Sequence, residues 1–127
     1  MQDPPFPPEI LAAVARFLKE EVAPAASERL SFQARVAANA LEMMRRQLEL
    51  APAQEAAERQ RLAALLGADG DLKTLTAELS RRLSSGEADL TTLGVADHLW
   101  TTALEKMAVD QPSYAAYRAS LAERTKA

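Results

Sequence analysis

The sequence contains no cysteine and only one histidine, His98. These shortages exclude disulfide bonds, thiolate nucleophiles, cysteine-ligated zinc and any metal site that needs two histidines of one chain. The four glycines form no phosphate-binding loop, and nucleophile-elbow and kinase signatures are missing. We therefore expect no catalytic residue, no metal and no cofactor, and we do not expect the chain to be an enzyme on its own.

An excess of positive charge is missing too. Fifteen basic residues are dispersed among eighteen acidic ones, for a net charge of −3, so no broad positive field would attract nucleic acid. The apolar runs are far shorter than the ~20 residues that a membrane-spanning helix needs. The first residues are acidic and proline-rich, unlike a secretory signal. We expect a cytoplasmic protein that binds neither nucleic acid nor membrane.

Aromatic residues are scarce, at 5% of the chain, whereas 27 residues are alanine. Alanine has the highest helix propensity and lets helices approach closely. No segment alternates with period two, as a strand would. The length of 127 residues suits one domain. We predict a single helical domain over residues 1–127, with flexible ends at 1–7 and 123–127.

Prolines, glycines and apolar spacing predict where the helices lie. We expect helices from Pro7 or Pro8 to Pro24, from Ser27 or Ser31 to Pro52, and from there to Leu66. A fourth begins at Asp71 and ends at Gly86, a fifth spans Val95–Val109, and a last one follows Pro112. The inward stripes are Leu30, Ala34, Ala37, Leu41, Met44 and Leu48 in the second helix, and Ala96, Leu99, Trp100, Ala103 and Met107 in the fifth. This pattern predicts an all-α fold, an antiparallel bundle of five or six helices.

One group of polar residues is a candidate ligand site. Arg35 and Asn39 lie one turn apart on the second predicted helix, and Lys106, Asp110 and Tyr114 lie near the end of the fifth. If these five side chains converge, they can bind an anionic group. The alternative is structural: Arg35 pairs with Asp110 or a nearby glutamate, and Asn39 satisfies a backbone carbonyl. For His98, a packing or surface role is favoured over a general-base role, because it has no fixed partner.

Three segments carry a resemblance to a known family. They are Phe32–Leu41 with the following Glu49–Pro52, then Ala57–Gly67, and finally Lys106–Tyr114. Together they resemble a bacterial helical domain family of unknown function. Its members occur alone or fused to aminoglycoside-phosphotransferase-like proteins, and often near acyl-CoA dehydrogenase genes. The resemblance implies an accessory role in such a pathway, and it implies no catalytic residues.

Two functions follow as hypotheses. The first is a non-catalytic accessory module that docks on a phosphotransferase-like protein or an acyl-CoA dehydrogenase, and it requires an exposed apolar patch. The second is a small-molecule binding protein or enzyme with an anionic ligand held around Arg35 and Asp110. Alanine-rich helices also pack closely in pairs, so a homodimer is compatible with either hypothesis.

Overall fold

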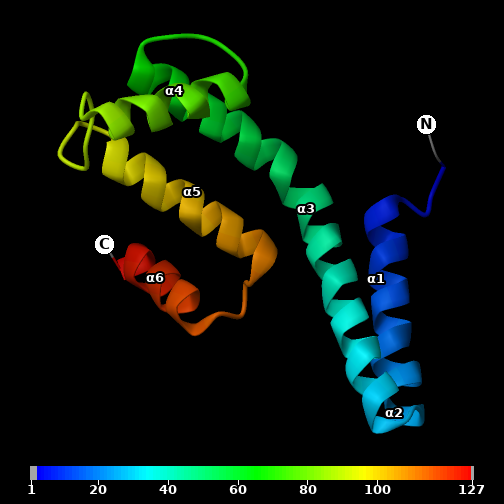
Figure 1. The fold of residues 1–127 in the computed structure, drawn as a ribbon. Helices are drawn as coiled ribbons and strands as arrows, with labels where there is room; N and C mark the ends of the chain where they lie inside the picture. Colours follow the sequence, from blue (N-terminus) through cyan, green and yellow to red (C-terminus); the bar gives the residue numbers. More distant parts are fainter. Residues whose placement is uncertain (1–2, 127) are drawn as a thin grey trace. The chain divides into compact units, whose positions relative to one another are not determined.

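The structure, a computed structural model, describes residues 3–126 and is all-α, with no strand in that part of the chain (Figure 1). It divides into two compact units. Unit 1 takes the chain up to Ala51 together with Val109–Gln111, and unit 2 takes Pro52–Ala108 and the chain from Pro112 onward. That both units belong to one domain stays a prediction. The predicted flexible ends, 1–7 and 123–127, fall partly on residues 1, 2 and 127, which lie outside the described residues.

Unit 1 is a helical hairpin. Helix α1 (Pro7–Phe17) continues through a π-helical segment, η1 (Leu18–Val22), into the short α2 (Ala23–Ala25). After a break, the first part of α3 (Glu28–Leu66) returns antiparallel to α1 (Figure 1). The side chains buried in this unit are small, which allows the two helices to approach closely; they include Ala15, Ala23, Ala34 and Ala38.

The turn of the hairpin lies two residues later than the proline pattern predicts. Pro24 does not end the helix; it lies inside α2, directly after the π-helical segment. The chain instead leaves helical geometry at Ala26, which has φ −95° and ψ 165°. Ser27 then begins the next helix, and its hydroxyl accepts a hydrogen bond from the backbone N–H of Leu30 at 3.4 Å.

The predicted boundary at Pro52 is wrong. Helix α3 runs without interruption for 39 residues, and Pro52 lies inside it. A proline in a helix interior removes one backbone hydrogen bond and crowds the carbonyl four residues earlier, at a cost of about 3 kcal/mol. That cost is compatible with a continuous helix when packing holds both halves. The division between the two units falls at this proline.

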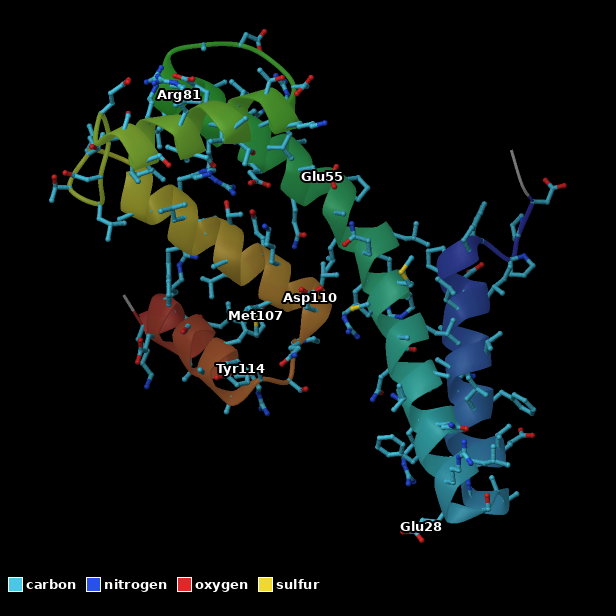
Figure 2. The ribbon with its side chains drawn as sticks, in the orientation of Figure 1. Glu28, Glu55, Arg81, Met107, Asp110 and Tyr114 are labelled. Atoms are coloured by element: carbon cyan, nitrogen blue, oxygen red, sulfur yellow. The ribbon has the colours of Figure 1, made fainter. Side chains whose placement is uncertain are left out.

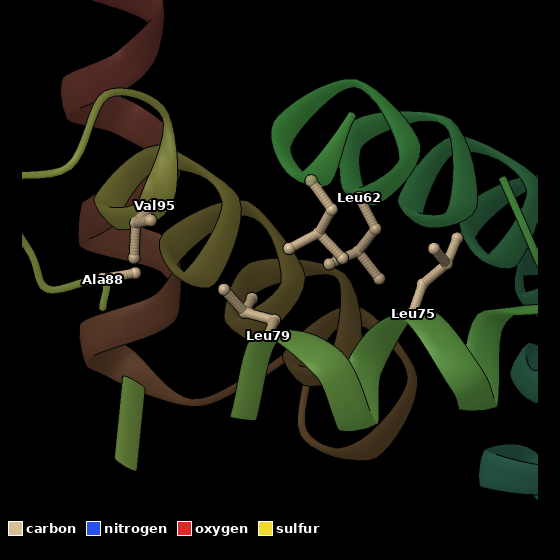
Figure 3. Packing of buried hydrophobic residues seen from close by; sticks show 6 residues of the cluster. Leu62, Leu75, Leu79, Ala88 and Val95 are labelled. Carbon is tan, nitrogen blue, oxygen red and sulfur yellow. The ribbon is translucent and has the colours of Figure 1, made fainter. Parts of the chain in front are cut away.

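The core of unit 2 lies between the last part of α3, helix α4 (Leu72–Ser85) and helix α5 (Val95–Asp110) (Figure 3). Leu62 and Val95 are fully buried in it. The other buried members of the cluster are Leu66, Leu75, Leu79 and Ala88. Because these residues come from three helices and one loop, the cluster fixes all four segments relative to one another within the unit.

The limits predicted for α4 are confirmed. Asp71 is extended, and its carboxylate accepts a hydrogen bond from the backbone N–H of Thr74 at 2.7 Å. This bond caps the helix and lowers the pKa of Asp71. Gly86 ends the helix with φ 79°, a left-handed conformation that glycine adopts without strain. Gly67 ends α3 in the same way, with φ 64°.

Helix α5 begins at the predicted residue, but its predicted inward stripe is wrong. Ala96, Leu99, Trp100 and Ala103 are exposed, and Met107 is only partly buried. The buried positions are Val95, His98, Leu104 and Val109. The last helix, α6 (Ala115–Lys126), has no buried residue.

Candidate functional site

The five predicted ligand residues are distributed over both units. Arg35 and Asn39 are exposed on α3 in unit 1, which also includes Asp110 at the end of α5. Lys106 and Tyr114 are exposed in unit 2, and Asp110 and Tyr114 are labelled in Figure 2. Among residues 3–126, no salt bridge within 4.0 Å joins Arg35 to Asp110 or to a glutamate. Convergence of the five side chains stays a prediction.

Charged groups near the candidate residues are already paired. Arg45 donates hydrogen bonds to the carboxylates of Glu42 and Glu49, at 2.9 and 2.7 Å. Its neighbour Arg46 donates from Nε to the backbone carbonyl of Val109 at 2.7 Å, within unit 1. That bond satisfies a carbonyl at the C-terminal end of α5, where a helix leaves its last carbonyls unpaired. Arg45 and Arg46 therefore stabilise the unit.

Unit 1 exposes large apolar side chains along α1. Phe6, Ile10, Val14 and Phe17 each expose between 43% and 51% of their surface. Their spacing of four, four and three residues places them on one side of the helix, and we call them the α1 stripe. Ala15, which is 1% exposed, lies on another side. Helix α1 thus has one apolar side that is buried in the hairpin and a second that is open.

The same unit exposes apolar side chains along α3. Val36, Met43 and Leu50 recur every seven residues, which places them in one line along the helix. The predicted inward seam is buried only at Ala34 and partly at Leu41. The remaining exposed apolar side chains of this part of α3 are Leu30, Phe32, Met44 and Leu48. Eleven of the seventeen large hydrophobic residues that the described chain exposes therefore belong to unit 1.

A second feature lies in unit 2, where the side chain of Arg61 on α3 binds polar side chains of α5. The guanidinium binds the carboxylate of Glu105 in a two-pronged arrangement, at 3.2 and 2.7 Å, and also reaches the hydroxyl of Thr102 at 3.3 Å. His98, Thr102 and Glu105 are four and three residues apart, so they share one side of α5. Two-pronged arginine–carboxylate pairs fix geometry well, so this pair fixes Arg61 against α5.

Beside Arg61 lies a cavity of about 340 Å³, which we call the His98 pocket. It is lined by Arg61, Ala64, Leu65, Leu93, Gly94, Asp97 and His98. His98 is 5% exposed. Among the described residues, neither Nδ1 of His98 nor Nε of Arg61 has a hydrogen-bond partner, although both atoms are buried. Buried polar atoms are normally paired, so two orphans beside one cavity mark an unusual site.

The environment of His98 lowers its pKa. Burial is the main cause, and the positive charge of Arg61 acts in the same direction. The carboxylates of Glu58, Glu105 and Asp97 act in the opposite direction and do not reverse the shift. His98 is therefore neutral at pH 7 in the folded chain.

This shift predicts a pH dependence of stability. Below an ordinary histidine pKa of about 6.5, the unfolded chain takes up a proton that folded His98 resists, so the free energy of unfolding falls as pH drops. We expect the urea midpoint to be lower at about pH 5.5 than at about pH 7.5. We expect His98→Gln to remove much of that difference. Equal pH dependence in both proteins would contradict the burial of a neutral imidazole.

The aromatic residues form a third feature, a groove of about 150 Å³ between α5 and α6 in unit 2. Trp100 and Met107 line it from α5. Tyr117 lines it from α6, and Tyr114 is the residue directly before that helix. Figure 2 labels Met107 and Tyr114. Of the predicted ligand residues, Tyr114 lines this groove, where most of its neighbours are apolar.

Neither a metal site nor a membrane span is found in the described part of the chain. No three histidine, aspartate or glutamate side chains of residues 3–126 lie close enough to hold a metal ion. None of the helices over these residues combines the length and the apolarity that crossing a membrane requires.

The sequence did not single out Arg61, and it assigned His98 no binding role. A signal was present, because Val95, His98, Thr102, Glu105 and Val109 recur at steps of three and four. This stripe contains two polar side chains and one charged side chain, whereas the stripe that was predicted to face inward is largely apolar. Arg61 on α3 pairs with Glu105 of this stripe, and this pairing offsets the cost of burying a charged group.

Comparison with known proteins gives one family. The family described as Domain of unknown function (DUF6285) matches residues 24–114. Searches of curated proteins and of solved structures find no match.

Proposed function

We propose that this chain, which belongs to the DUF6285 family, acts as an interaction module that docks on another protein through the apolar surface of unit 1. The observation that carries this proposal is the exposure of eleven large apolar side chains on one small hairpin. Large exposed apolar patches on proteins mark interaction sites, because water disfavours such surface.

The size of this surface suits a protein partner. A half-exposed aromatic or aliphatic side chain of this size offers roughly 80 Å². The four side chains of the α1 stripe together offer on the order of 300 Å², the size of the apolar patches that are often functional on single proteins. The α1 stripe alone contains two phenylalanines, and aromatic residues are enriched in the centres of interfaces.

The chemistry of unit 1 also favours docking over catalysis. Arg45 and Arg46 have hydrogen-bond partners within the unit. The four side chains of the α1 stripe are hydrocarbons, which provide no acid, base or nucleophile. An apolar helix side binds another apolar surface through area and shape.

The partner that we propose is a phosphotransferase-like protein or an acyl-CoA dehydrogenase, in the cytoplasm of a bacterium. This choice depends on the family resemblance of the three segments and on no contact in the structure. A second copy of the chain competes for the same surface, since a two-helix hairpin with an apolar side can pair with itself.

The test is native mass spectrometry of the tagged chain purified from its own host, with paired variants of α1. The double variant Val14→Ser/Phe17→Ser shortens two members of the α1 stripe. Its matched control, Ala13→Ser/Arg16→Ser, changes exposed neighbours on the same helix. We expect the wild-type chain and the control to retain a phosphotransferase-like protein or an acyl-CoA dehydrogenase. For the stripe variant, we expect the amount of co-purified partner to fall at least about tenfold, since central apolar contacts dominate interface energies.

Other outcomes contradict the proposal. A wild-type chain that appears only as a bare oligomer would assign the surface to self-association. A wild-type chain that appears only as a monomer would remove the docking role, and so would equal retention of the partner by both double variants. Circular dichroism of each variant shows whether its total helix content matches that of the wild-type chain.

The ligand hypothesis remains a second proposal. Its supporting observation is that Arg35, Asn39 and Lys106 are all exposed, which leaves their donor groups accessible to an anion.

A further inference from the structure

The His98 pocket has features of a built ligand site that the docking role does not use. All of its lining residues belong to unit 2, whereas the apolar docking surface belongs to unit 1. Its volume of about 340 Å³ lies within the range of small-molecule sites, roughly 300–1,000 Å³. Leu65, Leu93 and Ala64 give it an apolar wall, and Leu93 at its mouth is 96% exposed. Such a site prefers a ligand with an apolar body.

The histidine supplies the polar group of the pocket. Nδ1 of His98 is buried without a hydrogen-bond partner and His98 lines the pocket, so we infer that Nε2 is the ring nitrogen that a ligand in the pocket reaches. An unpaired buried N–H costs more than an unpaired lone pair, since backbone and side-chain donors are rarely left orphaned. The neutral ring therefore keeps its proton on Nε2 and offers a hydrogen-bond donor to the pocket.

The charges around this donor decide which acceptor suits it. One positive group, Arg61, and three negative groups, Glu58, Asp97 and Glu105, act on His98. Glu105 already neutralises Arg61 through the two-pronged pair. The surroundings are thus negative overall, so a carboxylate or phosphate would be repelled. A neutral carbonyl oxygen accepts the hydrogen bond without that repulsion, and Asp97 can accept an N–H from the same ligand.

We propose that the His98 pocket binds a neutral small molecule with an apolar body and an amide or similar carbonyl group, whose oxygen accepts a hydrogen bond from Nε2 of His98. The apolar body lies against Leu65, Leu93 and Ala64, and the amide N–H groups face Asp97. This assignment is independent of the docking surface.

The test uses three probes of one shape that differ in charge: benzamide, benzoate and benzylamine. Amide ¹H–¹⁵N spectra of the full chain are recorded during each titration. We expect benzamide to shift the signals of Gly94, Asp97 and His98 at roughly millimolar concentration, as suits so small a ligand. We expect benzoate to bind at least about tenfold more weakly, because it is repelled. We expect benzylamine to bind more weakly than benzamide, because its attraction to Asp97 does not replace the missing acceptor for His98.

Matched variants locate the binding. Ala64→Trp fills the pocket from an exposed position of α3, and Ala56→Trp makes the same change at an exposed position outside it. We expect Ala64→Trp to abolish the benzamide shifts and Ala56→Trp to leave them unchanged. His98→Phe keeps a ring without a donor, and His98→Gln keeps a donor. We expect the phenylalanine to weaken benzamide binding several-fold more than the glutamine does.

Three results would overturn the assignment. They are the absence of shifts at the pocket residues with benzamide, tighter binding of benzoate or benzylamine than of benzamide, and shifts that survive in Ala64→Trp. Each variant is first checked for a dispersed wild-type-like spectrum, so a loss of binding is separated from a loss of folding.

Discussion

Replacement of Leu62 by alanine is expected to lower the free energy of unfolding of unit 2 by about 2–5 kcal/mol. Leu62 is 0% exposed and lies in the cluster that joins α3 to α4 and α5 (Figure 3). The substitution removes buried methyl groups and leaves a cavity that the rigid helices fill only in part. Urea unfolding followed by circular dichroism measures the loss.

The expected loss is large compared with the total stability of unit 2. Folded domains have free energies of unfolding of roughly 0.05–0.15 kcal/mol per residue, so a loss of this size is a large share of the stability of unit 2. Leu90→Ala is the control, because Leu90 is 68% exposed and belongs to no core cluster. We expect it to change stability by less than about 0.5 kcal/mol. Similar losses in the two variants would contradict the position assigned to the core.

Replacement of Ala38 by leucine is expected to destabilise unit 1 by about 1–3 kcal/mol. Ala38 is 0% exposed in a hairpin whose buried positions are mostly alanines. A leucine there has no space, so α1 and α3 must separate or adopt strained side-chain conformations. Hydrogen exchange of the α1 amides measures the effect locally, and we expect faster exchange along α1 than in the wild-type chain.

The neighbouring alanine gives the control for this prediction. Ala37 is exposed, and Ala37→Leu makes the same chemical change one position away. We expect its α1 amides to exchange at the wild-type rate. Faster exchange in both variants would show that helix α3 itself, and not its contact with α1, responds to the substitution.

The sequence predicted the fold class and the limits of α4 correctly, because these depend on local signals. Alanine content favours helix, Asp71 caps α4 with its own carboxylate, and Gly86 ends it with a conformation that other residues rarely adopt. None of these signals needs knowledge of distant residues.

Predictions that depend on partners elsewhere in the chain failed. Pro52 was taken as a boundary because a proline usually ends a helix, yet α3 continues through it. The apolar stripe through Trp100 was predicted to face inward, yet His98 is buried on another side of α5, where Arg61 pairs with Glu105. The Arg35–Asp110 site needs the same long-range knowledge, and it stays a prediction.

The position of Trp100 determines what an optical experiment on this protein observes. It is the only tryptophan, it is 53% exposed, and it lines the groove between α5 and α6. Its fluorescence therefore reports the contact of α6 with α5, whereas circular dichroism reports every helix. Coincident unfolding curves from the two signals would mean that α6 unfolds together with the other helices in one cooperative step. An earlier fluorescence transition would mean that α6, which has no buried residue, detaches while the rest of the chain is still folded.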